Sequence, residues 1–360
     1  MRNTLSSAIG NKSFSMGKSG MNNLSKKEIE ERVQQILEAK GRKALEKAKK
    51  IMLEDIKEKE LHAPLQYLSE NWNDTLRPAL MALSCEAVGG KAEATTSAAT
   101  AMTLLCSSMN IYDNIMDRTK FKRFIPTLPE KFGNGLALIV AGLVTAKAFN
   151  VLYEHTEKEI PPAKHTTVNR LFQEFLMKMS EAEALNLSLR RQDGNVREKF
   201  RVLQIQAADI EACMKIGATI GCGSEHEVEQ LGRYGLLLGT TIELREDLWE
   251  ALNYTTELAD KIRNATPPYV LTWAVNHSEK ARDLLSTIAK KEEIKATDIK
   301  KVVEVMFEAG AVNHVNKLLR KIIKNGKNIV LELRESEAKH SLKLLVKAQE
   351  SLLFKAFSTN

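Results

Sequence analysis

Apolar residues recur every three or four positions along most of the chain from residue 26 onward. The period is clear in VQQILEAKGRKALEKAKKIML (33–53), RLFQEFLMKMSEAEALNLSL (170–189) and VLQIQAADIEACMKIGATI (202–220), and it predicts helices with one buried face. Proline and glycine fall in a few short stretches, and no run alternates between apolar and polar residues as a half-buried strand does. The pattern predicts an all-α fold, a single large helical domain over residues 26–360 without strands.

Two segments, roughly 79–112 and 203–220, are apolar or small on every side. Helices of this kind lie in the interior of a bundle, surrounded by other helices. The most apolar uncharged segment, Phe132–Ala146, has 15 residues, fewer than the roughly 20 that cross a bilayer. We therefore expect a helical bundle with interior helices and no transmembrane segment.

The first 25 residues are rich in serine and asparagine and contain no acidic residue. This composition is typical of a disordered tail, which we expect for residues 1–25, and organelle import sequences share it. The expected location is the cytoplasm, with organelle import as the alternative. The sequence Ser25-Lys-Lys-Glu28 has a capping-box pattern, so the first helix should begin directly after Ser25.

The overall composition narrows the function classes. Lysine and arginine exceed aspartate and glutamate by 53 to 46, and 43% of the residues are hydrophobic. The basic residues are spread along helical segments and form no stripe interleaved with aromatic residues, so nucleic acid is not an expected partner. The four cysteines show no C-x-x-C spacing and are expected as small buried residues in a reducing compartment.

Two aspartates end a long uncharged helical run, in the sequence YDNIMD (112–117). Asp113 and Asp117 are four residues apart, so they share one face of a helix. Taken alone, this spacing also suits a surface turn between helices. If the two carboxylates are buried, they need cations, because a bare buried charge is very costly.

A second acidic face is predicted in LGTTIELREDLWEALN (238–253). Its acidic residues, which fall in two pairs at i and i+4, are Glu243 with Asp247 and Glu246 with Glu250. Two such faces pointing into one cavity would bind a hard divalent cation through oxygen atoms. Mg²⁺ suits this arrangement because it retains water molecules that phosphate oxygens can displace.

A basic loop follows the first acidic motif directly. Its cations are Arg118, Lys120, Lys122 and Arg123. Lysine and arginine next to a carboxylate-bound metal ion suit a diphosphate, because the metal bridges carboxylate to phosphate and the cations hold the remaining oxygens. For Lys122 and Arg123 an exposed basic loop is the alternative interpretation.

These segments occur in an order that resembles the trans-polyprenyl diphosphate synthases, which have the class I isoprenoid synthase fold. TLRPALMALSCEAVGG (75–90) resembles that family's L-R-P stretch and its following G-G turn, and YDNIMD stands where its first aspartate-rich motif belongs. KRFIPTLPEKFGNG (122–135) and GRYGLLLGTTIELREDLWE (232–250) resemble the family's basic loop and the helix of its second acidic motif. The resemblance covers about residues 60–350.

The resemblance implies a single helical bundle with a central active cavity, and the condensation of isopentenyl diphosphate with an allylic prenyl diphosphate. It implies Asp113, Asp117 and Asp247 as the catalytic residues. Mg²⁺ would be held by these three with Glu243, Glu246 and Glu250, and the diphosphates by Arg77, Lys122, Arg123 and Lys261. It also implies a dimer, with a copy of the chain or with another prenyl synthase subunit.

Several residues depart from the family pattern, and the departures concern the diphosphate contacts. Asp74 stands at the position of an isopentenyl-binding lysine, Cys106 at that of a histidine, and Ala207-Ala208 near that of a Lys-Thr pair. Three functions remain open. The chain is an active prenyl diphosphate synthase, a weakly active or non-catalytic subunit of a heteromeric long-chain synthase, or a terpene synthase-like enzyme that ionises one prenyl diphosphate.

The resemblance also carries an expectation about product length. In this family the growing chain extends beside the helix that precedes the first acidic motif. Ser108 and Met109 lie one turn before Asp113, and Leu105 lies one turn further. None of these side chains is aromatic, so the implied product has five or more prenyl units.

Overall fold

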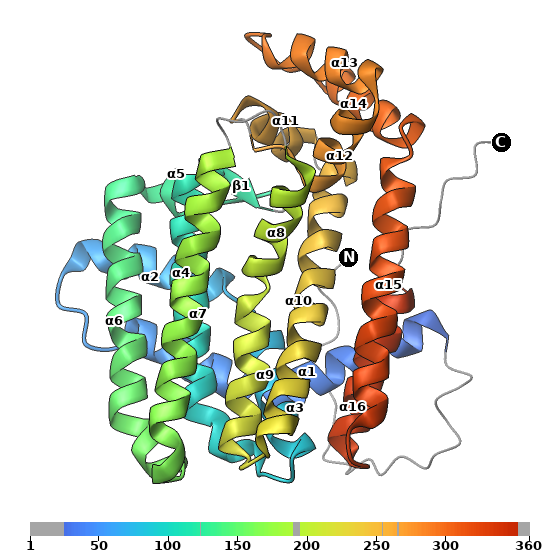
Figure 1. Cartoon of the computed structure of the whole chain (residues 1–360). Helices are drawn as coiled ribbons and strands as arrows, with labels where there is room; N and C mark the ends of the chain where they lie inside the picture. Colours follow the sequence, from blue (N-terminus) through green and yellow to red (C-terminus); the bar gives the residue numbers. More distant parts are fainter. Residues whose placement is uncertain (1–24, 123, 190–194, 254, 265, 352–360) are drawn as a thin grey trace.

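The computed structural model describes residues 25–122, 124–189, 195–253, 255–264 and 266–351, and these residues form a bundle of helices (Figure 1). The first helix, α1 (Lys26–Leu53), begins where the sequence predicts. The Ser25 side chain accepts a hydrogen bond from the Glu28 backbone nitrogen, and the Glu28 carboxylate accepts one from the Ser25 backbone nitrogen at 2.8 Å. The expected disordered tail lies outside the described residues, except for this capping serine.

Helix α4 (Thr96–Met116) is an interior helix, as its uncharged sequence predicts. Every side chain from Ser97 to Ser108 is buried. Its threonine hydroxyls are satisfied inside the helix, since Thr103 donates to the carbonyl oxygen of Ala99 at 2.8 Å. Helices α1, α3 (Leu76–Ala87) and α6 (Asn134–Glu159) pack around it, so no polar group of this stretch needs water.

Helices α3 and α9 (Ala208–Ile220) form a second interior contact, with their backbones very close. A Cβ atom at Gly217 would overlap the carbonyl oxygen of Met81, so only glycine permits this approach. The Ser84 hydroxyl donates a hydrogen bond to the carbonyl oxygen of Met214 at 2.5 Å in the same contact.

Both predicted interior segments are broken into two helices. The chain leaves α3 through a turn in which Gly89 has a φ of 85°, and then passes a short 3₁₀ helix, η1 (Ala92–Thr95), before α4. The second segment is interrupted at Ala207, between α8 (Val196–Gln206) and α9. Periodicity places the helices correctly but does not show these breaks.

The remaining helices complete the bundle and a cap at one end of it (Figure 1). They are α2 (Lys59–Asn71), α5 (Leu128–Phe132), α7 (Pro162–Leu189), α10 (Glu225–Asn253), α11 (Thr255–Arg263), α12 (Tyr269–His277), α13 (Glu279–Ala289), α14 (Ala296–Glu308), α15 (Ala311–Glu332) and α16 (Glu337–Ser351).

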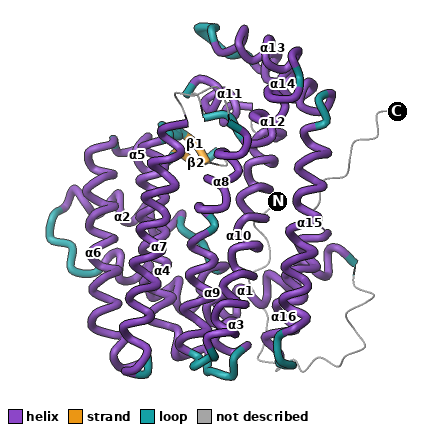
Figure 2. Tube along the Cα trace, in the orientation of Figure 1, coloured by secondary structure: helices purple, strands orange, loops and turns teal. Residues whose placement is uncertain are grey.

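The basic loop contains the strands that the sequence pattern does not predict. Strand β1 (Phe121–Lys122) pairs antiparallel with β2 (Ile125–Pro126), with Lys122 opposite Ile125, and the hairpin lies at the capped end of the bundle (Figure 2). The all-α fold is confirmed and this hairpin is an exception to it, because strands of two residues are too short to show alternation.

Helix α6 lies at one side of the bundle and contains the most apolar segment. The stretch Asn134–Glu154 is long and apolar enough to cross a membrane by length and composition, and 39% of its most apolar window is buried inside the protein. One such helix is weak evidence for a membrane span, because core helices have the same composition. Its outer face exposes Leu138, Ile139 and Phe149.

Candidate active site

The two predicted acidic motifs meet at one end of the bundle, below the cap formed by α11 and the β-hairpin (Figure 1). Asp113 lies in the last turn of α4, and Asp117 caps that helix. The backbone carbonyl of Asp117 accepts a hydrogen bond from the Asn264 side chain at 3.1 Å, which joins the end of α4 to the segment after α11. Asp247 lies near the C-terminal end of α10.

Two carboxyl groups of this site hold their protons near neutral pH. Burial and the charge of Glu183 raise the pKa of Asp113 to about 7, with smaller contributions from Asp117. Burial and the charge of Asp209 raise the pKa of Glu243 to about 8. Asp113 itself also raises the pKa of Glu243, so the first acidic motif and the second face the same region.

Asp247 is the most buried of the predicted metal ligands. Burial raises the pKa of its carboxyl group, and the charges of Lys261 and Lys199 oppose that shift. Its Oδ2 atom is buried without a hydrogen-bond partner among the described residues. A buried carboxylate oxygen of this kind requires a cation or a proton.

The other two predicted acidic ligands have different surroundings. Glu250 accepts a hydrogen bond from the Lys261 ammonium at 2.5 Å. Burial lowers the pKa of Lys261, but the charges of Glu250 and Asp247 outweigh this and raise it. Glu246 is half-buried and adds to the negative charge around Glu243.

The basic loop contributes one described cation to this site. Lys122 is exposed on β1, and its charge lowers the pKa of Asp113 against the effect of burial. Arg123 lies outside the described residues, so its predicted role stays a prediction. The exposed position of Lys122 leaves it accessible to an anion approaching the acidic groups.

The donor set suits a hard divalent cation, although the acidic groups are not assembled in advance. Within the described ranges, no three His, Cys, Asp or Glu side chains lie close enough to hold a metal ion. The Oδ1 atom of Asn114 and the Oδ2 atom of Asp247 are buried and have no hydrogen-bond partner there. Oxygen donors with free lone pairs fit Mg²⁺. Substrate phosphates and water molecules usually complete the coordination shell of this ion.

Two pockets on the described surface lie away from these groups. One, of about 390 Å³, lies beside Arg334, and another, of about 500 Å³, lies beside Lys327. At the acidic site itself, Arg77 and Lys261 form ion pairs with carboxylate groups. The predicted central cavity therefore stays a prediction, and a diphosphate would have to displace some of these cations from their partners.

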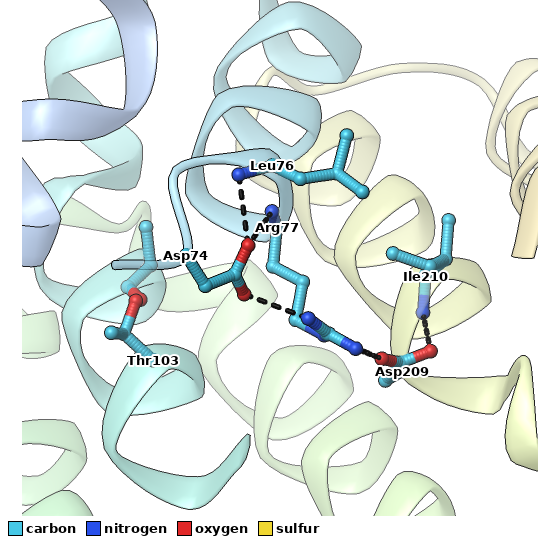
Figure 3. A network of polar contacts seen from close by, with 7 residues as sticks. Asp74, Leu76, Arg77, Thr103, Asp209 and Ile210 are labelled. Atoms are coloured by element: carbon cyan, nitrogen blue, oxygen red, sulfur yellow. Dashed lines mark hydrogen bonds and ion pairs between the residues drawn. The ribbon is translucent and has the colours of Figure 1, made fainter. Parts of the chain in front are cut away.

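A network of charges surrounds Arg77, the arginine that the resemblance assigns to diphosphate binding. Its Nε atom donates to Asp209 Oδ2 at 2.5 Å, and its Nη1 atom donates to Asp74 Oδ2 at 2.8 Å. Figure 3 shows the two carboxylates on either side of the guanidinium group. Burial lowers the pKa of Arg77, but Asp209 and Asp74 outweigh it and raise that pKa well above its usual value.

The same network contains the positions at which the sequence departs from the family. Asp74 is at the position of the expected lysine, and its Oδ1 atom also accepts from the Leu76 backbone at 2.9 Å. Cys106, at the position of the expected histidine, is buried beside Arg77, and burial raises the pKa of its thiol. Two carboxylates for one guanidinium leave excess negative charge where an anion would bind.

Three residues of the site were missed by sequence reasoning. Asp209 and Glu183 are buried acids, and Lys199 is a half-buried lysine on α8 whose charge acts on Asp247. Asp209 directly follows Ala207-Ala208, near the position of the family's Lys-Thr pair. This neighbourhood could have marked Asp209 as a residue of the site. Glu183 and Lys199 lie in ordinary helical patterns, and nothing near them in the sequence marks them.

Solved structures with the same fold confirm the predicted isoprenoid synthase bundle. Geranylgeranyl pyrophosphate synthetase from Pyrococcus horikoshii superposes with a TM-score of 0.78 at 22% identity, over 89% of this chain and 98% of that one. Geranylgeranyl pyrophosphate synthase from Corynebacterium glutamicum, solved with isoprenyl diphosphate and magnesium, superposes with a TM-score of 0.73 at 18% identity, over 91% and 98%.

Sequence comparison identifies the family. The chain is 26% identical to the geranylgeranyl diphosphate synthase of Methanosarcina mazei over 285 residues, which cover 78% of this chain and 86% of the relative. Residues 58–306 match the Polyprenyl synthetase family. That match includes both acidic motifs, the basic loop and the Arg77 network, and it confirms the resemblance that those motifs carry. The chain therefore belongs to the polyprenyl synthetase family.

Proposed function

We propose that this chain is a prenyl diphosphate synthase, a transferase that joins isopentenyl diphosphate to an allylic prenyl diphosphate. The observation that carries the proposal is that acids from two helices far apart in the sequence face one region. The charge of Asp113 on α4 acts on Glu243 of α10, and the charges of Lys261 and Lys199 act on Asp247 of the same helix. The names of the relatives support the substrate class.

Each predicted residue has a place in this proposal. Asp113, Asp117 and Asp247, with the nearby glutamates, would hold Mg²⁺, which on binding would neutralise the diphosphate and make it a better leaving group. Lys122 and Lys261 would bind phosphate oxygens, as would Arg123. The buried surroundings of Asp113 and Asp247 would exclude water from the allylic carbon and so favour prenyl transfer over hydrolysis.

The test is turnover by the purified chain with Mg²⁺, isopentenyl diphosphate and geranyl, farnesyl or geranylgeranyl diphosphate. The double variant Asp113→Ala/Asp117→Ala should abolish product formation and Mg²⁺-dependent pyrophosphate binding while the helical content stays the same. The matched control is Glu225→Ala/Glu229→Ala, which removes two exposed acids, also four residues apart, from the far end of α10. Unchanged pyrophosphate binding in the Asp113/Asp117 variant would contradict the metal-site assignment.

A second candidate function follows from the Arg77 network. Since Asp74 and Asp209 both bind Arg77, the site that would take isopentenyl diphosphate repels anions. We infer that such a chain works best as a subunit beside a synthase whose motifs are complete. Addition of a motif-complete homologue should then raise long-chain synthesis above the sum of the separate rates. Full-rate synthesis by the isolated chain, unaffected by any homologue, would exclude this role.

The outer face of α6 is the proposed subunit interface, occupied in the isolated protein by a second copy of this chain. Leu138, Ile139 and Phe149 are exposed on it by 46%, 58% and 47%. Gly135 and Gly142 have open space next to them, which lets a second helix approach closely. The dimer implied by the family resemblance, formed through helices at the flank of the bundle, supports this choice of occupant.

A further inference from the structure

The proposed function leaves the diphosphate short of cations, because most of those at the site already have carboxylate partners. Arg77 is bound by Asp74 and Asp209 (Figure 3). Lys261 donates to Glu250 at 2.5 Å. A diphosphate that displaced either cation would leave a buried or half-buried carboxylate unpaired, Asp209 or Glu250, which is costly.

Lys199 differs from these cations. It lies on α8, which packs against α7, α10 and α12, and its side chain is half-buried. Its Nζ atom donates a long hydrogen bond, 3.4 Å, to Asn186 Oδ1. Within the described part of the chain, no carboxylate lies within salt-bridge distance of it. A half-buried ammonium group without an ionic partner can accept an anion at little cost.

The position of Lys199 matches that of the expected diphosphate. Burial lowers its pKa, and the charges of Asp247 and Asp117 act against that shift. These residues belong to the second and the first acidic motif, so charges of both motifs act on the ammonium group. A diphosphate bridged to both motifs would pass close to this group.

The chain also lacks the cation that the family resemblance places nearby. Ala207 is fully buried at the junction of α8 and α9, and a Cβ atom at Gly239 of α10 would lie within 3 Å of its Cβ atom. Such close packing leaves no room for a lysine at 207. Lys199 lies on α8, eight residues before Ala207 and about two helical turns nearer the capped end.

We propose that Lys199 is a diphosphate-binding residue of this chain and takes the place of the lysine missing at the α8–α9 junction. The inference rests on the proposed function, because it requires a diphosphate between the acidic motifs. Its ammonium group would donate to oxygen atoms of the prenyl diphosphate. It would thereby compensate in part for the positive charge that is lost near Ala207.

The test is calorimetric titration of the full chain and its variants with inorganic pyrophosphate in the presence of Mg²⁺. Lys199→Gln should weaken binding by roughly tenfold to a hundredfold, the range for a hydrogen bond to a charged group. Lys199→Arg should keep most of the affinity because it keeps the charge. Arg201→Gln is the matched control, since Arg201 is on the same helix but exposed and paired with Glu198 at 3.3 Å.

The outcomes separate this inference from the proposed function. If Lys199→Gln binds pyrophosphate as well as the unmodified chain while Asp113→Ala/Asp117→Ala does not bind, Lys199 is not a ligand and the metal site stands. If Lys199→Gln binds more tightly, the lysine acts as a counter-ion that occupies the metal position, and the inference is wrong. If the unmodified chain binds no pyrophosphate with Mg²⁺, both the proposed function and the inference fail.

Thermal unfolding of the same variants excludes a trivial loss of fold. Among the described residues Lys199 has no ionic partner to lose, so Lys199→Gln should melt at the temperature of the unmodified chain or above it. A lowered melting temperature together with weakened binding would assign Lys199 a structural role and would overturn its assignment as a ligand.

Discussion

Asp113 and Glu243 are carboxyl groups whose raised pKa values, about 7 and about 8, place their titration in the physiological range. The folded protein binds protons at these groups at pH values at which the unfolded chain has already released them. The contribution of these two groups to the stability of the free protein therefore falls as pH rises from about 4 to about 8. A metal ion that binds the ionised carboxylates offsets this loss.

Metal and diphosphate binding should accordingly release protons. Mg²⁺-dependent pyrophosphate binding is expected to tighten as pH rises from 6 to 8.5, because the ligands must be deprotonated. Calorimetry in buffers with different ionisation enthalpies measures the number of protons released. The variant Asp113→Asn/Glu243→Gln should release fewer protons. An affinity that is the same across this pH range would contradict the assignment of these two residues to the metal site.

The Arg77 network predicts a large effect of a single substitution on stability. Asp209→Ala removes one of the two carboxylates that bind Arg77. Because Asp74 still pairs with the guanidinium group, the expected loss is that of a hydrogen bond to a charged group, about 1.5–3 kcal/mol. Urea unfolding measures this difference. Glu229→Ala is the control, because Glu229 pairs with Lys215 while largely exposed, and exposed pairs contribute about 0–1 kcal/mol. Equal effects of both substitutions would show that the network does not stabilise the fold.

At the scale of helices and strands, the hydrophobic pattern predicts most of the fold because helix spacing is a local property. The interior position of α4 follows from its uncharged sequence, and the start of α1 follows from Ser25 and Glu28. The break at Gly89 and the hairpin of β1 and β2 cannot be predicted from the hydrophobic pattern. Both depend on a few residues and on their neighbours in space.

Part of the candidate site was predictable from the sequence because the spacing of residues along one helix is a local property. Asp113 with Asp117, and Glu243 with Asp247, are neighbours on their own helices, so spacing identifies them. The contact between Arg77 and Asp209 joins residues 132 positions apart. A single sequence holds no local signal for such a contact, which arises only when α3 and α9 pack together.

Helix α4 also carries the prediction about product length. Ser108 is buried, and its hydroxyl donates a hydrogen bond to the Ala141 carbonyl oxygen of α6 at 2.9 Å. Ser108→Phe should shorten the prenyl product of the chain or of its complex, because the ring would fill space beside α4. Product analysis by chromatography measures this, with Ser188→Phe, an exposed site on α7, as the control.

This prediction about Ser108 has its own stability check. An added ring in a packed interface typically costs about 1–3 kcal/mol, so the thermal stability of Ser108→Phe is measured before its products are compared. A stable variant with an unchanged product distribution would show that elongation does not take place beside this position.

At the scale of the whole molecule, the exposed side of α6 predicts the oligomeric state. Ile139→Glu places a charge in the proposed interface and should convert the dimer into a monomer in analytical ultracentrifugation. Leu331→Glu is the matched control, since Leu331 is similarly exposed, by 53%, but lies on α15. Dimers that persist in Ile139→Glu, or a monomeric unmodified chain, would contradict the proposed interface.

The contact between α3 and α9 has a consequence for motion. Backbone touches backbone at Gly217, and the pair of Arg77 and Asp209 joins the same helices near the acidic site. Two helices fixed at both points move as one rigid body. Opening and closing around a substrate must then come from the cap that covers the site, α11 and the β-hairpin. Lys122 lies on the hairpin, so it would move with the cap, while Arg77 would stay with the fixed pair of helices.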